Sequence, residues 1–596
     1  MTTTAPLFDR RTPEFPTIPN VTLHDPQNRH IKVITVGAGV AGILNAYNIQ
    51  IECSNVSHVV YEKNADVGGT WFENRYPGCA CDVPSHAYSY HFAPNPDWPR
   101  FLSRREDIWS YLDRVCRVFD LRRHMRFGVE VVGACWDDDA AQWRVKLRRR
   151  GVDGSSVQQE EFEDTCDVFL YCTGILNNWT WPKIDGLESF EGRMIHTARW
   201  PDGYHGEEQW KGQRVAVIGS GASSLQVVQS MQPHVAEMDI FVRTGVWFAP
   251  LVDDLPEEYV YSKEEMERFR RDPEKLVEHV KRFDTQLNRM WPAFFTGSAL
   301  QKSIREKIEA RMGQLIRDER LLQGFTPQFA VGCRRITPGE GYLRAIQQPN
   351  VSVHFTPVTK IVPNGVIGGD GVLREADTVI CATGFDVSFR PRFPIVGKNG
   401  VSLSNLWHDQ PPCAYFGLTV PDMPNFMMQG GPPSPVQNGT PFGGFHAAAG
   451  YAHAAAGYAL HIIRKLQREN VRALHPKREV VRAFARHVDD YFAGTVFADA
   501  CRSWYKDNET GRVNAVWPGS ALHYRKVLEN PRWEDYEIEY RDKGNMFSWM
   551  GLGFVQEQVT PEADSAFYLS VDNIDPLWMK EIQGTGEMGT AGGQIK

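Results

Sequence analysis

Two stretches of this chain combine an apolar strand, a glycine-rich turn and the start of a helix, and this combination constrains the fold more than any other feature. The first follows a strand predicted over 31–36, and its glycines have the spacing G-x-G-x-x-G at Gly37, Gly39 and Gly42. The first glycine permits the tight turn, the second lets the backbone approach a pyrophosphate, and the third lets helix and strand pack closely. Free N–H groups and the helix dipole attract phosphate charge. We therefore predict a dinucleotide site at this turn.

An acidic residue in register supports this prediction. A second apolar strand, predicted over 58–61, leads into Glu62, about twenty residues past the last glycine. A carboxylate at that place accepts hydrogen bonds from ribose hydroxyls. An ordinary βαβ crossover without a ligand is the alternative. The succession of strand, glycines, helix, strand and acid favours the dinucleotide.

The same pattern returns near residue 214, where the three key positions hold Gly219, Gly221 and Ser224. The next strand, predicted over 238–242, ends in Arg243 and Thr244, so an arginine stands where the first unit has Glu62. A guanidinium there suits a ribose 2′-phosphate, which predicts NADP at the second site; a surface arginine is the alternative. Two units with opposite charges at this position imply two different dinucleotides.

The predicted fold class is α/β, with two Rossmann-type dinucleotide-binding domains and an α-helical insertion in the second. A chain of 596 residues is too long for one core. Charged amphipathic patterns occupy about residues 251–325, and we assign their charges to solvent. The predicted segments are an N-terminal arm (1–28), the first part of the first domain (29–180), the second domain with its insertion (181–385), and the second part of the first domain with a C-terminal tail (386–596).

Composition excludes several other classes. The net charge of −8, without a basic tract interleaved with aromatic residues, argues against nucleic acid. The N-terminus lacks the apolar stretch of a secretory signal. The nearest candidate for a membrane span, 446–465, is rich in alanine and is more typical of a helix packed inside a domain. We expect a cytoplasmic monomer that binds neither nucleic acid nor a membrane.

The eleven cysteines are scattered and include no C-x-x-C pair. Cys79 and Cys81, one residue apart, would make a poor disulfide or zinc pair. Reduced structural thiols are usual in proteins inside cells. We therefore expect reduced thiols throughout and no metal site.

A segment between the two units has the form F-x-G-x-x-x-H-x-x-x-W-P, from Phe190 through His196 to Pro201. It resembles the fingerprint of Baeyer–Villiger monooxygenases, which use FAD and NADPH to insert oxygen beside a ketone carbonyl. The loop "GGTWFENRYPGCACD" is similar to their second fingerprint, and "VGCRR", "SWYKDN" and "ATGFD" are similar to further family elements. The resemblance extends from about residue 31 to 508. It implies FAD in the first domain and NADPH in the second.

By position, the family's catalytic arginine falls on Arg335 and its partner carboxylate on Asp82. In the family, reduced flavin and oxygen give a C4a-peroxyflavin that must remain anionic to attack a ketone. A permanently charged guanidinium favours this anion, whereas a buried lysine could lose its proton. The paired carboxylate would orient Arg335 and offset its charge. A structural ion pair between domains is the alternative.

The resemblance also implies cofactor contacts. Arg334 takes the place of a family lysine near the 2′-phosphate, and Arg243 with Thr244 takes that of a phosphate-binding pair. Trp504 matches a tryptophan in a mobile loop over the nicotinamide, for which a place in a core is the alternative. His196 matches a histidine that serves motion of the cofactor domain, and a structural histidine is the alternative. Further contacts are expected from Gly69, Thr70, Trp71 and Tyr76.

The function implied is that of an FAD-containing, NADPH-dependent monooxygenase that converts a ketone, as a small-molecule substrate, to an ester or lactone with O₂. A related flavin monooxygenase that oxidises nitrogen or sulfur is one alternative; it needs no arginine at the flavin, so Arg335 argues against it. A flavin disulfide reductase would need a C-x-x-C pair. A flavin-binding sensor or scaffold without turnover is the third alternative.

Overall fold

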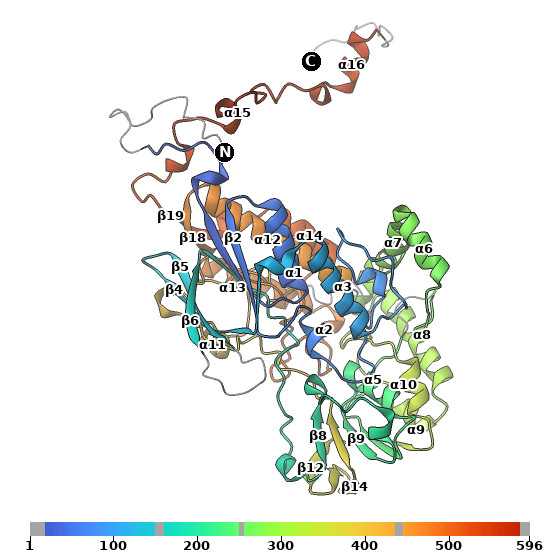
Figure 1. Ribbon diagram of the computed structural model, residues 1–596. Coiled ribbons are helices and arrows are strands. Elements are labelled where there is room, and N and C mark those ends of the chain that lie inside the picture. The colour runs from blue at the N-terminus through green and yellow to red at the C-terminus, as the bar shows by residue number, and fades with distance from the viewer. Residues whose placement is uncertain (1–17, 150–159, 250–254, 435–444, 585–596) are drawn as a thin grey trace.

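The computed structural model describes residues 18–149, 160–249, 255–434 and 445–584. Two five-stranded parallel sheets form its centre, and Figure 1 shows them in separate halves of the molecule, with β2 in one and β8 and β9 in the other. The first sheet has the order β17-β7-β1-β2-β3, and its strands are β1 (Ile31–Val36), β2 (Val56–Glu62), β3 (Met125–Phe127), β7 (Val168–Tyr171) and β17 (Phe426–Met428). Because β17 pairs with β7, the C-terminal part of the chain returns to the first sheet.

Both faces of the first sheet are covered. Ile31 and Val33 of β1 point into a core shared with helices, and Ile34 and Val36 point into a second core on the opposite face. Successive strand side chains alternate between faces, so a sheet buried on both sides has a continuous apolar sequence. The helices are α1 (Val40–Glu52), α3 (Arg105–Val118), α12 (Phe445–Arg468) and α14 (Ala521–Leu528). The opposite face is covered by a sheet of β4 (Val129–Asp137), β5 (Gln142–Arg149), β6 (Glu161–Cys166) and β16 (Ile395–Val396).

The second sheet repeats this architecture with the order β11-β10-β9-β15-β8. Its strands are β8 (Arg193–His196), β9 (Arg214–Ile218), β10 (Glu237–Phe241), β11 (Val351–His354) and β15 (Thr378–Cys381). Val215 and Val217 of β9 face a core with α5 (Ala222–Met231), whereas Ala216 and Ile218 face a small sheet. That sheet consists of β12 (Val358–Val362), β13 (Gly365–Gly368) and β14 (Leu373–Glu375). The predicted α/β class and its repeat of two dinucleotide-type units are confirmed.

Helices fill the chain between β10 and β11. They are α6 (Lys263–Arg271), α7 (Pro273–Arg289), α8 (Ala299–Leu315), α9 (Glu319–Phe325) and α10 (Glu340–Ala345). The side chains of Ser262 and Glu265 form a capping box that starts α6. The predicted insertion, 251–325, covers α6 to α9, apart from residues 251–254, which lie outside the described ranges.

The expectation that the insertion's charges face solvent is wrong for Glu257. Its carboxylate accepts hydrogen bonds from the N–H groups of Gly339 (3.0 Å) and Glu340 (3.1 Å) at the start of α10. Burial raises the pKa of Glu257 to about 7. Amphipathic periodicity identifies the polar face of a helix but not a carboxylate in the loop before it, so sequence alone did not show this cap.

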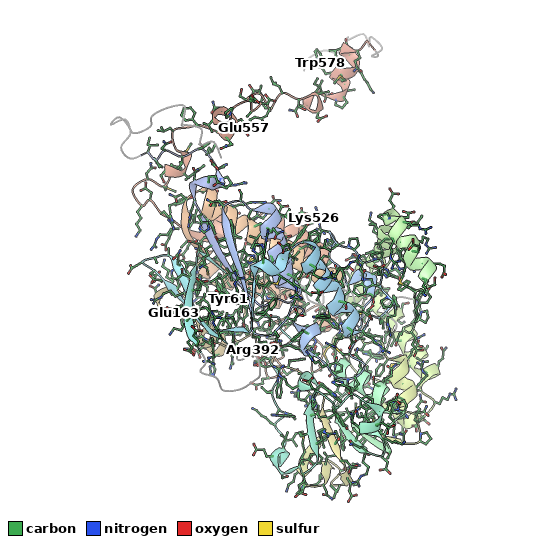
Figure 2. All side chains as sticks on the ribbon, in the orientation of Figure 1. Tyr61, Glu163, Arg392, Lys526, Glu557 and Trp578 are labelled. Atoms are coloured by element: carbon green, nitrogen blue, oxygen red, sulfur yellow. A yellow bond between two sulfur atoms is a disulfide. The ribbon has the colours of Figure 1, made fainter. Side chains whose placement is uncertain are left out.

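The C-terminal part ends in a segment that leaves the body of the protein. Strands β18 (Val471–Pro476) and β19 (Tyr536–Tyr540) pair with each other, and α13 (Arg478–Phe492) follows β18. Beyond β19, α15 (Gln556–Val559) and α16 (Pro576–Ile582) extend away, as Figure 2 shows at Glu557 and Trp578. The remaining helices are α2 (Thr70–Glu73), α4 (Glu207–Trp210) and α11 (Leu403–Asp409). No helix in the described ranges is both long and apolar enough to span a bilayer.

Candidate active site

The first glycine turn has the backbone geometry of a phosphate-binding turn. Gly37 has a φ of 99°, and a Cβ there would lie 2.8 Å from the carbonyl oxygen of Cys172. A Cβ on Gly42 would collide with the carbonyl oxygen of Gly37. Gly39 caps α1 without a side-chain hydrogen bond, so the first N–H groups of the helix are left for a ligand.

Glu62 lies at the carboxyl end of β2 beside this turn and is 3% exposed. One of its carboxylate oxygens accepts from the N–H of Ala38 (2.7 Å) and the other from the N–H of Asn64 (2.8 Å). Burial raises the pKa of Glu62, against the opposing effect of these two N–H donors. The carboxylate is thus fixed where a ribose hydroxyl of a bound dinucleotide would donate to it.

The loop that follows β2 lies against the glycine turn. A Cβ on Gly69 would approach within 3.0 Å of the Cα of Gly39. The short helix α2 begins at Thr70, whose hydroxyl accepts a hydrogen bond from the side chain of Asn74 (2.7 Å). The indole N–H of Trp71 donates to the hydroxyl of Tyr88 (2.7 Å). Gly69, Thr70 and Trp71 therefore lie next to the predicted first cofactor site.

The Tyr-Pro-Gly part of the same loop contacts the second unit. The hydroxyl of Tyr76 donates to the side-chain carbonyl of Gln226 in α5 (2.9 Å), and the Gln226 amide donates to the carbonyl of Ala80 (3.0 Å). Gly78 has a φ of 78°, and a Cβ there would meet the backbone of Gln226 at 2.7 Å and collide with Ser230. Tyr76 thus holds the two units together in this structure, while its predicted cofactor contact stays a prediction.

The second glycine turn differs from the first at its third position. Gly219 has a φ of 121°, and a Cβ there would lie 2.5 Å from the carbonyl of Ala382. Ser224 is fully buried, and its hydroxyl donates to the carbonyl of Gly219 (2.7 Å), so the serine is accommodated inside the turn. A Cβ on Gly221 would meet nothing within 4 Å, which leaves space in front of α5.

Three guanidinium groups gather beside the second turn, from Arg243, Arg334 and Arg502. Burial lowers the pKa of Arg243, and the charge of Arg502 lowers it further. Burial likewise lowers the pKa of Arg334, with Arg243 adding to the effect. No carboxylate in the described part of the chain pairs with any of the three. Clustered cations without a counter-charge are typical of an anion site, which suits a 2′-phosphate.

Thr244 is the next residue after Arg243, and its carbonyl accepts a hydrogen bond from the hydroxyl of Ser220 (3.2 Å). Sequence reasoning missed Arg502. Its only signal was its place just before the "SWYKDN" element, because the fold alone brings it to Arg243.

Arg335 and Asp82 form a bidentate ion pair, with Nε to Oδ2 at 2.8 Å and Nη2 to Oδ1 at 2.5 Å. Their side chains are 23% and 18% exposed. Burial lowers the pKa of Arg335, but Asp82 raises it and the net shift is upward. The guanidinium therefore keeps its charge, as the prediction requires.

Two tyrosines missed by sequence reasoning lie near this pair. Burial raises the pKa of Tyr505 and of Tyr88, and the Arg335 charge acts on both in the opposite sense. Trp504 lies edge-on to Tyr505, with ring centroids 4.7 Å apart, and packs half-buried against a small core. The Trp504 loop thus reaches the neighbourhood of Arg335.

His196 lies at the end of β8 and is 1% exposed. Its Nδ1 accepts from the N–H of Ala198 (3.2 Å), so Nε2 carries the proton and donates to the hydroxyl of Thr383 (3.2 Å). The ring stacks on Trp179, with centroids 4.9 Å apart. Burial lowers its pKa to about 4, so the imidazole is neutral. The fingerprint histidine therefore links two segments that connect the halves of the molecule.

The expectation of reduced thiols throughout is wrong for Cys333 and Cys501, which form a disulfide. These cysteines are 168 residues apart, so their spacing gave no signal of the pairing. The other nine cysteines are free, including Cys79 and Cys81. The described residues include no cluster of His, Cys, Asp or Glu side chains that could hold a metal ion.

Gln429 is a further buried polar group of interest. It follows β17 at the carboxyl edge of the first sheet, where sheets of this kind bind ligands. The side chain is 5% exposed, and neither its amide nitrogen nor its oxygen has a hydrogen-bond partner among the described residues. An unpaired buried amide is costly, so this position fits a polar ligand group at the first cofactor site.

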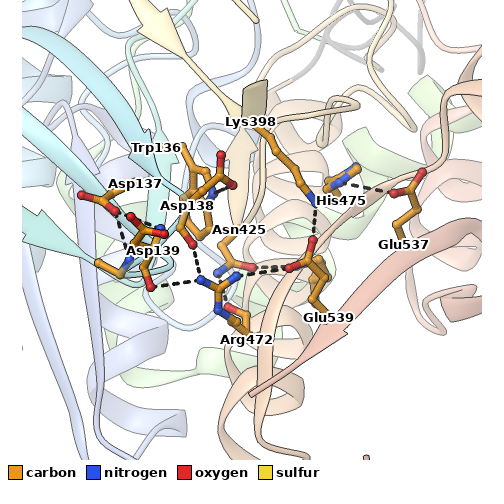
Figure 3. Close-up of polar contacts among 12 residues, drawn as sticks. Trp136, Asp137, Asp138, Asp139, Lys398, Asn425, Arg472, His475, Glu537 and Glu539 are labelled. Atoms are coloured by element: carbon orange, nitrogen blue, oxygen red, sulfur yellow. Dashed lines mark hydrogen bonds and ion pairs between the residues drawn. The ribbon is translucent and has the colours of Figure 1, made fainter. Parts of the chain in front are cut away.

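A hollow of about 640 Å³ lined by charged residues lies elsewhere, beside β19. Figure 3 shows that Lys398 and Arg472 both pair with Glu539. Arg472 also donates to the carbonyl of Asp139 (3.0 Å). The central charges of this hollow compensate one another. Through its contacts with Glu539 and Asp139, Arg472 links β19 to the turn between β4 and β5. The candidate active site does not lie at this hollow but at Arg335.

The known proteins that this chain resembles in sequence and in structure are monooxygenases. The family model of flavin-binding monooxygenase-like proteins matches residues 30–394. The chain is 53% identical to the FAD-binding monooxygenase moxY of Dothistroma septosporum, over 94% of this chain and 88% of that protein. It is 33% identical to a Baeyer-Villiger monooxygenase of Streptomyces coelicolor, over 86% of this chain and 94% of the relative. The crystal structure of cyclohexanone monooxygenase from Rhodococcus sp. Phi1 bound to NADP⁺ superimposes with a TM-score of 0.71 at 25% identity, covering 86% of this chain and 99% of that chain.

Proposed function

The chain belongs to the flavin-binding monooxygenase-like family, and from this premise we propose that it is a Baeyer–Villiger monooxygenase that converts a ketone to an ester or lactone. FAD would occupy the first glycine turn and NADPH the second. The overall reaction consumes a ketone, O₂, NADPH and a proton, and yields the ester, NADP⁺ and water. FAD, once bound and reduced by NADPH, supplies the oxygen-activating chemistry.

The observation that carries the proposal is the geometry of Arg335. Asp82 holds Nε and Nη2, whereas Nη1 donates to no group in the described part of the chain. The two N–H groups of Nη1 are thus available to an oxygen atom that develops negative charge during ketone oxygenation. Asp82 fixes the plane of the guanidinium and keeps this mostly buried cation from being uncompensated.

The surrounding residues supply binding and exclusion of water. Arg243, Arg334 and Arg502 would hold the 2′-phosphate of NADPH, and Glu62 the ribose of FAD. The loop with Trp504 and Tyr505 lies next to Arg335 and would cover the bound nicotinamide. A closed site favours ketone oxygenation over loss of the oxidising equivalents to water.

Substitution of Arg335 tests the proposal. In Arg335→Ala we expect ketone oxygenation to fall at least about 100-fold, since removal of one charge-stabilising donor costs that much. NADPH oxidation should persist and deliver hydrogen peroxide instead of ester. The measurements are ester yield by gas chromatography over a panel of linear, cyclic and bulky ketones, NADPH consumption and peroxide release. Arg317→Ala, at an exposed arginine, is the matched control.

Thioether oxidation by the same variant separates the main alternative. Oxidation of sulfur needs no cation beside the flavin, so it should survive in Arg335→Ala while ester formation is lost. Ester formation at the wild-type rate in this variant would remove Arg335 from the mechanism. Sulfur or nitrogen oxidation by the wild type, with no ester from any ketone, would favour the related class of flavin monooxygenase.

A further inference from the structure

We propose that the Cys333–Cys501 disulfide is a covalent positioning element of the candidate active site, and that a dithiol can open it. The inference rests on the proposed function for its consequence, because it concerns the placement of the residues assigned there to NADPH and ketone. The bridge itself is a property of the fold.

The disulfide joins the two segments that carry the key cations. Cys333 directly precedes Arg334 and Arg335, and Cys501 directly precedes Arg502. The bridge therefore holds two of the three guanidinium groups of the anion site near each other, although their charges repel. It also fixes the segment with Arg335 relative to the loop with Trp504.

Besides the bridge, the two segments are joined at Asp499, whose carboxylate accepts a hydrogen bond from the N–H of Ala330 (2.7 Å). The carbonyl of Asp499 accepts from the ammonium of Lys506, which lies on the same segment as Asp499 (2.5 Å). Neither hydrogen bond involves any of the three arginines. Without the disulfide, repulsion among the arginines would favour separation of the segments whenever NADP⁺ is not bound.

Lys506 makes the bridge open to exchange. It is 4% exposed, and its Nζ lies 3.6 Å from the sulfur of Cys333. A cation beside a sulfur stabilises the thiolate form and so improves it as a leaving group. Cys333 is fully buried, whereas Cys501 is half-buried, so an incoming thiolate reaches Cys501.

The exchange would then take a defined course. One thiolate of the dithiol attacks Sγ of Cys501 and forms a mixed disulfide. The Cys333–Cys501 bond breaks, and its electron pair leaves with Sγ of Cys333 as a thiolate beside Lys506. The second thiolate of the dithiol attacks the mixed disulfide and releases Cys501. The protein gains two thiol groups, and the dithiol leaves as its cyclic disulfide.

The first experiment establishes the bridge. Mass spectrometry of a non-reduced digest of the full chain should yield a peptide that links Cys333 to Cys501. Thiol labelling after denaturation should modify nine of the eleven cysteines before reduction. Eleven labelled cysteines, with no linked peptide, overturn the inference and leave the proposed function standing.

The second experiment measures its consequence as NADP⁺ affinity of the FAD-loaded enzyme, with and without dithiothreitol. Reduction should raise the dissociation constant about tenfold, as when the binding-competent arrangement falls to about a tenth of the population. Cys413→Ser, which removes a half-buried free thiol, should respond like the wild type. The double variant Cys333→Ser/Cys501→Ser should bind NADP⁺ weakly with or without dithiothreitol. Lys506→Gln should slow opening of the bridge at least about tenfold.

The outcomes separate the two proposals. If the linked peptide is found but reduction of the disulfide in the wild-type enzyme leaves its affinity for NADP⁺ unchanged, the positioning role is overturned. This conclusion holds whether or not the double variant folds. An unchanged rate of opening in Lys506→Gln overturns the role of the ammonium. Oxidised wild-type enzyme that binds no NADP⁺ at all contradicts the proposed function, and the consequence inferred for the bridge falls with it.

Discussion

The guanidinium of Arg502 reaches the second unit from a distant part of the chain and meets Arg243 there. Like charges in a partly buried site repel, and the lowered pKa of Arg243 records this repulsion together with burial. Such a cluster is stable only if the fold holds it or an anion neutralises it. The 2′-phosphate distinguishes NADPH from NADH, so the cluster should act on that choice.

We expect Arg502→Ala to weaken NADPH binding about 10- to 100-fold, because a charge-assisted contact to phosphate contributes about 1.5–3 kcal/mol. NADH binding should change little, since it lacks the phosphate. The Michaelis constants for both cofactors, measured with one ketone, give the ratio directly. Arg289→Ala, at an exposed arginine of α7, is the control and should leave the ratio unchanged. An equal loss for NADPH and NADH would contradict a phosphate contact.

His196 allows a prediction about pH. Its pKa falls from 6.5 to about 4 on folding, because burial favours the neutral ring that links Ala198 and Thr383. Between pH 6.5 and pH 4, His196 therefore binds a proton in the unfolded chain but stays neutral in the folded chain. The stabilisation is present above pH 6.5 and is lost as the pH falls towards 4, by about 2 kcal/mol at pH 5.

His196→Asn should remove this pH dependence while keeping an acceptor for the Ala198 N–H. We expect the variant to be less stable than the wild type at pH 7.5 and the difference to shrink by pH 5. Urea unfolding followed by tryptophan fluorescence at both pH values measures it. His408→Asn, at an exposed histidine, should show a constant difference. A difference that does not change with pH would show that folding does not lower the pKa of His196.

At the scale of elements, the contact between the Tyr76–Ala80 loop and α5 sets how the two units face each other. Gly78 is needed there for two separable reasons, its φ of 78° and the close approach of Gln226 and Ser230. Gly212 has nearly the same φ, 74°, but a Cβ there would meet nothing within 4 Å. The two glycines therefore separate backbone strain from steric contact.

Gly78→Ala should cost about 1–3 kcal/mol more than Gly212→Ala, since the added methyl must displace the backbone of α5. It should also lower the yield of ester per NADPH, because the loop carries Asp82 at its end. Thermal unfolding and product analysis of the two variants measure both effects. Equal destabilisation would mean that the loop does not press on α5.

How far sequence predicts these elements depends on how local their determinants are. The predicted bounds of β1 and the predicted position of Glu62 agree with the structure. They could be predicted because the glycine turn, the helix and the acidic residue of a βαβ unit all lie within about thirty residues of sequence. The pair of Arg335 and Asp82 spans 253 positions, and it was predicted by family resemblance rather than by spacing. Arg502 and Tyr505 lie beside and within the "SWYKDN" element, which the family resemblance identifies, but only the tertiary fold brings this segment to Arg335 and pairs Cys501 with Cys333.

At the scale of the whole molecule, the candidate site is assembled from three parts of the chain. The first unit contributes the loop with Asp82, the second unit contributes Arg243, Arg334 and Arg335, and the C-terminal part contributes Trp504 and its neighbours. This arrangement explains why the chain returns to the first sheet through β17 before it supplies that last segment. It also implies that the chain beyond β19 is not part of the site.

Truncation tests that division. In the segment from Gln556 to Gly584 no described side chain is buried, and Leu569 and Leu577 are 72% and 75% exposed. Its hydrogen bonds to other described residues are local. The free energy of unfolding of a chain that ends at Val555 should therefore lie within about 1 kcal/mol of that of the full chain, because only exposed residues are removed. This shortened chain should oxygenate ketones at the same rate as the full chain. A chain that ends at Glu534 also loses β19 and the pairing of Glu539 with Lys398 and Arg472, and it should be clearly less stable. Stability is measured by thermal unfolding and activity by ester formation. Equal losses of stability and activity in the two truncated chains would show that the exposed segment stabilises the part of the protein that carries the candidate active site.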